Sequence, residues 1–154
     1  MQCCYAKSIS KNKWRVIALR LYISGPMTGL PALNYPAFYA TADVLTRLGH
    51  FAINPANGVT DDDNATQPWG YFMLRSLRIL RDSAVEALVI LPGWEQSRGA
   101  RIEIGDAIRR GLMLYRLIGD TLHPVPMSEI RPGLLAMTEE DFEYLHQDID
   151  SLAG

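Results

Sequence analysis

Hydrophobic residues follow two periodicities along the chain, and their alternation predicts strands that alternate with helices. Short aliphatic and β-branched runs, each closed by Gly, Pro or a polar residue, are typical of buried strands. Four strands are predicted at residues 14–24, 50–54, 87–91 and 112–118, and a short fifth at residues 121–125. Pro124 and Pro126 limit the length of the fifth. The pattern therefore predicts a sheet of four to five strands.

Apolar residues at helical spacing follow each of the first three strands and occur again near the C-terminus. The predicted helices cover residues 35–48, 68–82, 99–111 and 138–152. Asn34 or Tyr35 can cap the first helix, Gly49 ends it, and Thr138 can cap the last. The second helix has an apolar stripe of Met73, Leu77, Leu80 and Ala84 and a basic face of Arg75, Arg78 and Arg81. We expect at least two of these arginines to be solvated. The last helix has an apolar face of Phe142, Leu145 and Ile149.

Strands that alternate with helices indicate an α/β fold with a mostly parallel sheet and right-handed crossovers. The chain has 154 residues, 48% of them hydrophobic, which is enough for one domain with its own core. We expect that domain at residues 14–154, after a flexible polar tail at residues 1–13. In such folds the first and third strands are commonly neighbours near the ligand site. Residues 55–67, with acids at 61–63, are predicted to form a solvated loop rather than a metal site.

Composition and charge narrow the classes of function. The formal net charge of −2 argues against a nucleic-acid polymer as partner, because proteins that bind such polymers usually carry a basic surplus. Cys3 and Cys4 are adjacent, so we expect no disulfide framework and a cytoplasmic protein. Neither a signal peptide nor a membrane span is expected. His50, His123 and His146 stand far apart in the sequence, so we expect no metal site. No cofactor is expected.

The segment 88–108 carries most of the candidate chemistry. It has the pattern of a strand, a tight Pro92-Gly93 loop and a helix N-terminus, with Glu103 in the first turns of that helix. Such a loop lies at the carboxyl end of a parallel strand, where free N–H groups and the helix dipole suit a phosphate or another anion. An acid beside an anion site is electrostatically unfavourable unless chemistry needs it. Glu103 is therefore either a functional carboxylate or an exposed Glu paired with a nearby arginine.

Two loops are expected to converge at this edge of the sheet, residues 24–30 after the first strand and residues 92–99 after the third. Asn54 ends the second strand at the same edge. The glycines and prolines of residues 25–33 let the backbone approach a ligand, or they form a plain connection. The indole of Trp94 can stack on a base or sugar, or it can anchor the loop by packing.

Four segments occur in a characteristic order. They are Tyr22-Ile-Ser-Gly-Pro-Met-Thr-Gly, Asn54-Pro-Ala, Leu91-Pro-Gly-Trp and Ser97-Arg-Gly-Ala-Arg-Ile-Glu-Ile-Gly. Together they resemble the nucleoside 2-deoxyribosyltransferase superfamily, and within it the small bacterial and phage branch formed by the DUF4406 group. The similarity extends from Leu19 to Val125. It implies a flavodoxin-like, Rossmann-like three-layer sandwich, a homo-oligomer, and cleavage or transfer at the N-glycosidic bond of a (deoxy)nucleoside or its 5′-monophosphate.

The resemblance also implies roles for individual residues. In that superfamily the Glu of the Ser-x-Gly-x-x-x-Glu stretch attacks the anomeric carbon, and the matching residue is Glu103. In its monophosphate-hydrolase branch the Ser of that stretch and neighbouring backbone amides hold the 5′-phosphate, which corresponds to Ser97 and Gly99. Together with the expected cleft, this gives as substrate-binding residues Tyr22, Ser24, Gly25, Pro26, Met27, Asn54, Trp94, Ser97, Arg98 and Gly99.

The sequence departs from the resemblance at one point. Catalytic members of the superfamily carry an Asp in the helix before the third strand, where this chain has Ser76 and Arg78. The nearest acids, Asp82 and Glu86, do not align with that position. We expect an enzyme that acts on a small-molecule nucleoside or nucleotide through Glu103. The missing Asp favours the alternative, a non-catalytic nucleotide-binding or sensing module, and a scaffold for assembly is a third hypothesis.

Overall fold

Five strands form one sheet in the order β2-β1-β3-β4-β5, in a computed structural model that describes residues 17–82 and 84–148. The strands are β1 (Arg20–Ser24), β2 (Phe51–Ile53), β3 (Ala87–Ile90), β4 (Met113–Ile118) and β5 (Thr121–Pro124). β1 pairs in parallel with β2 and β3, and β3 pairs in parallel with β4. β5 returns antiparallel to β4. The mostly parallel sheet and the adjacency of the first and third strands are confirmed.

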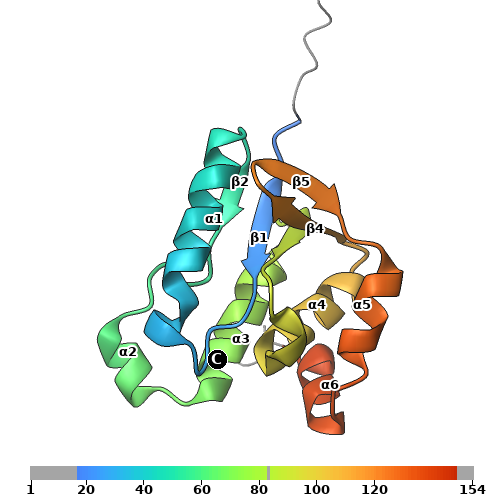
Figure 1. Cartoon of the computed structure of the whole chain (residues 1–154). Coiled ribbons are helices and arrows are strands. Elements are labelled where there is room, and N and C mark those ends of the chain that lie inside the picture. The colour runs from blue at the N-terminus through green and yellow to red at the C-terminus, as the bar shows by residue number, and fades with distance from the viewer. Residues whose placement is uncertain (1–16, 83, 149–154) are drawn as a thin grey trace, which may run out of the picture.

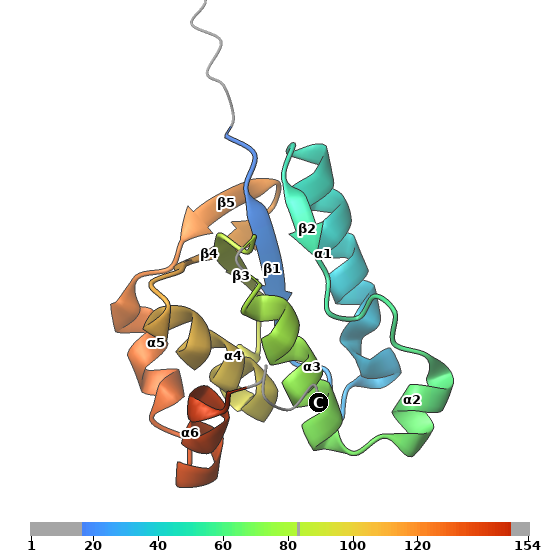
Figure 2. The ribbon, with the colours of Figure 1, turned by 180° about the vertical axis from the view of Figure 1, so that it is seen from behind.

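Helices cover both faces of the sheet and give the predicted three-layer α/β architecture, consistent with a flavodoxin-like fold. The α-helices are α1 (Tyr35–Arg47), α2 (Asp61–Thr66), α3 (Trp69–Leu80), α4 (Arg98–Arg109), α5 (Met127–Leu134) and α6 (Glu139–His146). The 3-10 helices are η1 (Pro31–Asn34) and η2 (Trp94–Gln96). Figure 1 shows α1 on the near face of the sheet. Figure 2 shows α3 and α4 on the opposite face, with α5 and α6 beside α4.

The alternation of side chains along β1 determines which layer each residue contacts. Leu21 and Ile23 belong to the apolar cluster that contains Phe38 and Leu45 of α1. Tyr22 points the other way and belongs to the cluster formed with α3 and α4. Ser24 follows Tyr22 by two residues and therefore lies on the face of β1 toward α4, where it is fully buried. β1 thus carries two polar side chains into the layer that contains Glu103.

The first strand and the last helix along the chain are shorter than the sequence predicts. β1 begins at Arg20, because its neighbours are short strands and its pairing with β2 begins at Phe51. The last helix ends at His146, where Gln147 is extended. There Arg81 and Arg109 donate hydrogen bonds to carbonyl groups of α6 and Gln147. Residues 1–16 and 149–154, which include the predicted tail and Ile149, lie outside the described residues.

Two helices were not predicted. Residues 55–67 hold α2, whose N-terminus has a capping box between Thr60 and Asp63, so the acidic run is the first turn of a helix rather than a loop. α5 contains Pro132, and Ile130 is its buried residue. Within residues 17–82 and 84–148, no helix has the length and apolar character needed to cross a membrane.

The basic face of α3 is not mainly solvated, contrary to expectation. Arg81 forms an ion pair of 2.8 Å with Asp106 of α4, whose side chain is buried. Arg75 donates hydrogen bonds of 2.7 and 2.6 Å to the carbonyl oxygens of Pro55 and Asn57 after β2. Both arginines therefore connect α3 to neighbouring parts of the fold.

Candidate functional site

A cavity of about 990 Å³ opens beside the carboxyl ends of β1 and β3, where the two predicted loops converge. This is the edge at which ligands bind in open parallel sheets. Its walls come from residues 25–28, Leu30 and Leu33 after β1, Tyr35 and Phe38 of α1, Pro55, Val59 and Asn64 around α2, Trp69, Phe72, Met73, Arg75 and Ser76 of α3, and Pro92, Gly93, Gln96–Ala100 and Glu103 around α4. The described part of the chain thus brings together the loop after β1, the loop after β3 and Glu103.

Glu103 lies at the cavity with its side chain almost wholly inside the protein, 7% exposed. Its Oε1 accepts a hydrogen bond of 2.7 Å from the hydroxyl of Tyr22, and its Oε2 accepts one of 2.5 Å from the hydroxyl of Ser24. Tyr22 and Ser24 are themselves fully buried. Two donors on two different carboxyl oxygens hold the side chain in one orientation. The alternative of an exposed Glu paired with an arginine is therefore wrong.

Burial and hydrogen bonding act on this carboxyl group in opposite directions. Burial favours the neutral acid and raises the pKa of Glu103, whereas the hydroxyls of Ser24, Tyr22 and Ser76 favour the carboxylate and lower it. Burial dominates, and the pKa of Glu103 rises from 4.5 to about 7. The group therefore exchanges a proton near neutral pH, as catalytic acids and bases commonly do.

Tyr22 does not share this property. Burial and the negative charge of Glu103 raise the pKa of Tyr22 well above its usual value of 10.0. The phenol consequently stays protonated and remains a hydrogen-bond donor at neutral pH. Neither Tyr22 nor Ser24 is among the residues that line the cavity. Their geometry supports a role in holding Glu103 rather than the predicted direct contact with substrate.

The N-terminus of α4 faces the same cavity. Ser97 is its N-cap, and the Ser97 hydroxyl accepts a hydrogen bond of 3.3 Å from the amide of Ala100. Gly93 precedes η2 with a φ of 83°, a left-handed conformation that glycine adopts readily. Ser97 and Gly99 line the cavity as the sequence predicts. About one turn of helix separates Gly99 from Glu103.

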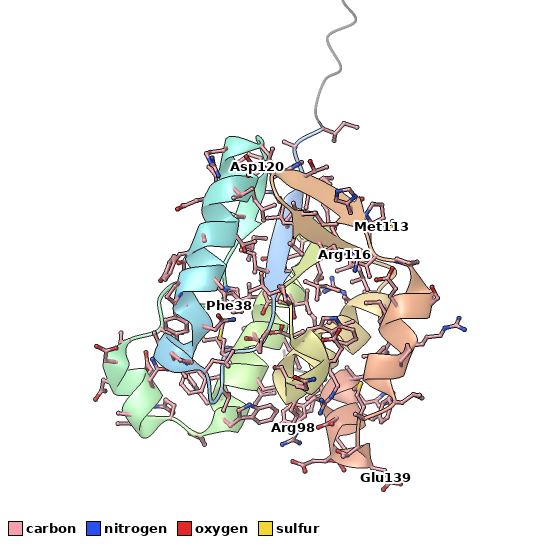
Figure 3. The ribbon with its side chains drawn as sticks, viewed as in Figure 1. Phe38, Arg98, Met113, Arg116, Asp120 and Glu139 are labelled. Carbon is pink, nitrogen blue, oxygen red and sulfur yellow. The ribbon has the colours of Figure 1, made fainter. Side chains whose placement is uncertain are left out.

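Arg98 also lines the cavity, but its charge is already balanced. Its Nε lies 2.6 Å from Asp141, its Nη2 lies 2.8 Å from Glu140, and its guanidinium stacks 4.4 Å from the ring centroid of Trp69. Hydrogen bonds to the two α6 carboxylates raise the pKa of Arg98, so it stays charged. Figure 3 shows Arg98 where α4 begins, beside α6, at the opposite end of the molecule from Asp120. Arg98 therefore joins α4 to α6 in addition to facing the cavity.

Besides Tyr22 and Ser24, two more of the predicted substrate-binding residues, Trp94 and Asn54, do not line the cavity. Trp94 is buried in the core, where its ring packs on Gly133 of α5, so the packing alternative describes it. Asn54 is 5% exposed, and its Oδ1 accepts a hydrogen bond from the amide of Ala56. Its Nδ2 is buried without a hydrogen-bond partner among the described residues. These two side chains lie behind the walls of the cavity.

Gly25 has a packing reason for being glycine. A Cβ at this position would lie 2.6 Å from the Cβ of Leu91, so only glycine allows the loops after β1 and β3 to approach so closely. Pro26 and Met27 continue this loop along the cavity wall. The segment ends in strained backbone, because Ala32, Leu33 and Asn34 all have positive φ. The Asn34 amide donates a hydrogen bond of 2.8 Å to the Pro26 carbonyl and closes the loop.

Sequence reasoning did not identify the contribution of α3 to this site. Five residues of α3 line the cavity, and four of them follow helical spacing, Trp69, Phe72, Met73 and Ser76. The apolar stripe chosen from the sequence shares only Met73 with this face. A search of α3 for aromatic and polar residues separated by three and four positions would have found it. The Ser76 hydroxyl of α3 also lowers the pKa of Glu103.

The fold and the cavity define an α/β protein with a single buried glutamate at the ligand edge of its sheet, within the described residues. The chain belongs to the DUF4406 family, described as a domain of unknown function, whose match covers residues 19–115. That span contains both cavity loops, α3 and Glu103, and it ends before α5 and α6. No curated protein and no solved structure matches the chain significantly.

Proposed function

We propose that this protein cleaves or transfers at the N-glycosidic bond of a nucleoside or nucleoside 5′-monophosphate, with Glu103 as the nucleophile. The observation that carries the proposal is a buried carboxyl group that reaches the cavity while Tyr22 and Ser24 fix both of its oxygens. The resemblance of four segments of the sequence to nucleoside 2-deoxyribosyltransferases supports it.

Cleavage of an N-glycosidic bond is assisted by a carboxylate beside the anomeric carbon, the position proposed for Glu103. Departure of a base leaves oxocarbenium character at the anomeric carbon, which a carboxylate stabilises or captures as a glycosyl ester. Water as the second acceptor gives hydrolysis, and a second base gives transfer. The pKa of about 7 means that a large fraction of Glu103 is ionised at neutral pH. The two hydroxyl donors keep the carboxylate aligned during the attack.

The N-terminus of α4 supports the choice of a phosphorylated substrate. Ser97 and Gly99, at the start of the helix, line the cavity, and such termini favour phosphate. Arg75 adds a cation to the cavity wall, and the acceptors of its two hydrogen bonds are neutral backbone carbonyls. Binding a remote phosphate would position the anomeric carbon against Glu103. The phosphate and the nucleophile would then occupy the same helix, one turn apart.

A second candidate function is nucleotide binding or sensing without catalysis. It is favoured by the cavity's lack of a second carboxyl group among the described residues, because departure of an ordinary base needs a proton donor. This candidate predicts thermal stabilisation by nucleotides without release of base. Assembly into a homo-oligomer, implied by the sequence resemblance, stays a prediction.

The test is release of free base, measured by chromatography after incubation of the pure protein with a panel of nucleosides and 5′-monophosphates. Glu103→Gln keeps the shape and polarity of the side chain but removes the nucleophile, so we expect release to stop while nucleotide binding persists. Release that continues unchanged in Glu103→Gln excludes Glu103 as nucleophile. Binding without any release in the native protein supports the second candidate.

A matched pair of variants at Ser97 tests whether a phosphate binds at the N-terminus of α4. Ser97→Asp and Ser97→Asn both keep a good helix N-cap, so both are expected to fold. Only Ser97→Asp adds a negative charge where the phosphate is proposed to bind. We expect it to weaken binding of monophosphates strongly and binding of unphosphorylated nucleosides little, with Ser97→Asn close to the native protein. Equal effects of both variants on both ligand types would exclude a phosphate at this helix end.

A further inference from the structure

The cavity is lined by few side chains that could donate or accept a proton in a reaction. Among the described residues that line it, Glu103 is the only one with a carboxyl or imidazole group. Two carboxylates of α6, Asp141 and Glu140, contact the lining residue Arg98 and are bound to its guanidinium. Burial raises the pKa of Asp141, but hydrogen bonds from Thr138 and Arg98 and the positive charge of Arg98 outweigh it and lower the pKa, so Asp141 is ionised and holds no proton to donate at neutral pH.

An N-glycosidase for ordinary nucleotides needs two functional groups. One stabilises the sugar carbon, and the other protonates the base as the bond breaks, because a neutral purine or pyrimidine leaves poorly as an anion. Glu103 cannot serve both roles in one step, since attack requires the ionised form and proton donation requires the neutral form. The hydroxyl groups on the walls, such as those of Tyr35 and Ser76, are much weaker acids than a carboxyl group.

A base that already carries a positive charge removes this difficulty. When its bond to the sugar breaks, the bonding electron pair returns to the ring nitrogen and the base leaves as a neutral molecule. No proton is required. A single carboxylate is then sufficient for the cleavage step.

The walls of the cavity suit such a base. The partly exposed aromatic residues Tyr35 of α1 and Phe72 of α3 line the cavity. Aromatic faces attract cations within about 6 Å of the ring centroid. Trp69 already binds a planar cation in this way, because the Arg98 guanidinium lies 4.4 Å from its ring centroid. Glu103 adds a negative charge close to the position of the departing base.

We propose that the cavity takes nucleotides whose base carries a fixed positive charge on its glycosidic ring, of the N-ribosylpyridinium or N7-alkylated purine type. This inference rests on the proposed function and names its substrate class. Within it, the Glu103 carboxylate forms a C–O bond to the anomeric carbon while the C–N bond breaks, and the electron pair of that bond neutralises the base. Water then attacks the ester, releases the sugar phosphate and restores the carboxylate, and one proton passes to solvent.

The experiment compares cationic and neutral bases on the same sugar phosphate. Native protein is incubated with nicotinamide mononucleotide, its 2′-deoxy analogue and 7-methylguanosine 5′-monophosphate, which distinguish the two types of cationic base. The matched neutral compounds are reduced nicotinamide mononucleotide and guanosine 5′-monophosphate, and deoxyadenosine and deoxycytidine 5′-monophosphates complete the panel. Free base is quantified by chromatography, with Glu103→Gln as the control for every compound.

We expect Glu103-dependent release from at least one cationic compound to be on the order of 100-fold faster than from the neutral ones, because a general acid typically contributes 10²–10⁴-fold. Comparable or faster release from the neutral nucleotides, lost in Glu103→Gln, overturns this inference and leaves the proposed function intact. Release from no compound overturns both. Release that is unchanged in Glu103→Gln overturns the assigned role of the carboxylate and the inference with it.

Discussion

The hydroxyl of Tyr22 on β1 donates a hydrogen bond of 2.7 Å to Oε1 of Glu103 on α4, and 81 residues of sequence separate the two. Ser24, two residues further along β1, donates a hydrogen bond to the other carboxyl oxygen of Glu103. Both contacts follow from the alternation of side chains along β1 and from its interior place in the sheet, between β2 and β3. The buried acid is therefore held by the strand over which α4 packs.

Because the pKa of Glu103 is raised from 4.5 to about 7, the folded protein binds this proton more tightly than the unfolded chain. The native stability should therefore fall as the pH rises from about 4.5 to 7 and then level off, a contribution of up to about 3 kcal/mol. Glu103→Gln should remove this slope and be more stable than the native protein at pH 8. Urea unfolding at pH 5, 6, 7 and 8 measures the free energy of unfolding of both proteins. The exposed Glu95→Gln is the control, and parallel native and Glu103→Gln curves would contradict the prediction.

The Tyr22 hydrogen bond should govern the pH dependence of the proposed reaction. Tyr22→Phe removes a donor that lowers the pKa of Glu103, so less carboxylate is present at pH 7. We expect base release to fall about tenfold at pH 7, because hydrogen bonds to charged groups contribute roughly 1.5–3 kcal/mol. At pH 9 the ionised fraction recovers, and the deficit should shrink. Tyr39→Phe, on the exposed side of α1, should match the native rate profile. A Tyr22→Phe deficit that is constant with pH would argue against this role.

The buried ion pair between Arg81 and Asp106 should contribute far more to folding than the exposed pair between Arg47 and Asp120. Asp106 is 2% exposed, and Arg81 contacts it through two nitrogens at 3.0 and 2.8 Å. Asp106→Asn removes the countercharge of a guanidinium whose side chain is only 21% exposed and should cost about 3 kcal/mol. The Arg47–Asp120 pair is 3.8 Å apart with both side chains about two-thirds exposed, so Asp120→Asn should change stability by less than about 1 kcal/mol. Chemical denaturation of the two variants compares them directly, and similar losses would contradict the distinction.

The fold was largely predictable because its signals are local. Runs such as residues 87–91 and helices such as residues 35–48 show their periodicity within the segment itself, and their alternation specifies a parallel sheet. The short elements were not predictable in this way. α2 is a polar helix of six residues whose only clear signal is the Thr60–Asp63 capping box, and α5 contains Pro132, which usually marks the end of a helix.

The position of the site in the fold was predictable from the sequence, but the burial and packing of Glu103 were not. The rule for parallel sheets places Ser97, Gly99 and Glu103 at one edge, and the cavity lies there. Burial of Glu103 depends on packing that no local pattern records, because α4 contacts α3, α5 and α6 as well as the sheet. Gly105 lies in one of these contacts, since a Cβ there would be at an ordinary van der Waals distance of 3.5 Å from Leu145 of α6. The sequence predicts Trp94 at the cavity, but Trp94 packs on Gly133 of α5. The two residues are far apart in sequence, so no local pattern records their contact.

Two glycines in helices should respond in opposite ways to the same substitution. In Gly133→Ala the new Cβ would lie 2.4 Å from Cη2 of Trp94, within a buried contact that has no space for it. Overpacking of this kind costs about 1–3 kcal/mol. In Gly99→Ala the nearest atom is the sulfur of Met73 at 3.8 Å, an ordinary contact, and alanine favours the helix by up to about 1 kcal/mol.

Urea unfolding should therefore show Gly133→Ala as destabilised and Gly99→Ala as equal to the native protein or more stable. Ligand binding should show the reverse order. The Gly99 backbone lines the cavity where the phosphate is proposed to bind, so a methyl group there should weaken monophosphate binding in a protein that is at least as stable. Gly133→Ala should bind normally under conditions where it is folded, because Gly133 supports Trp94 behind the cavity wall. Unchanged monophosphate affinity in Gly99→Ala would mean that the phosphate does not approach the start of α4, and Arg75 would then be the cation to test.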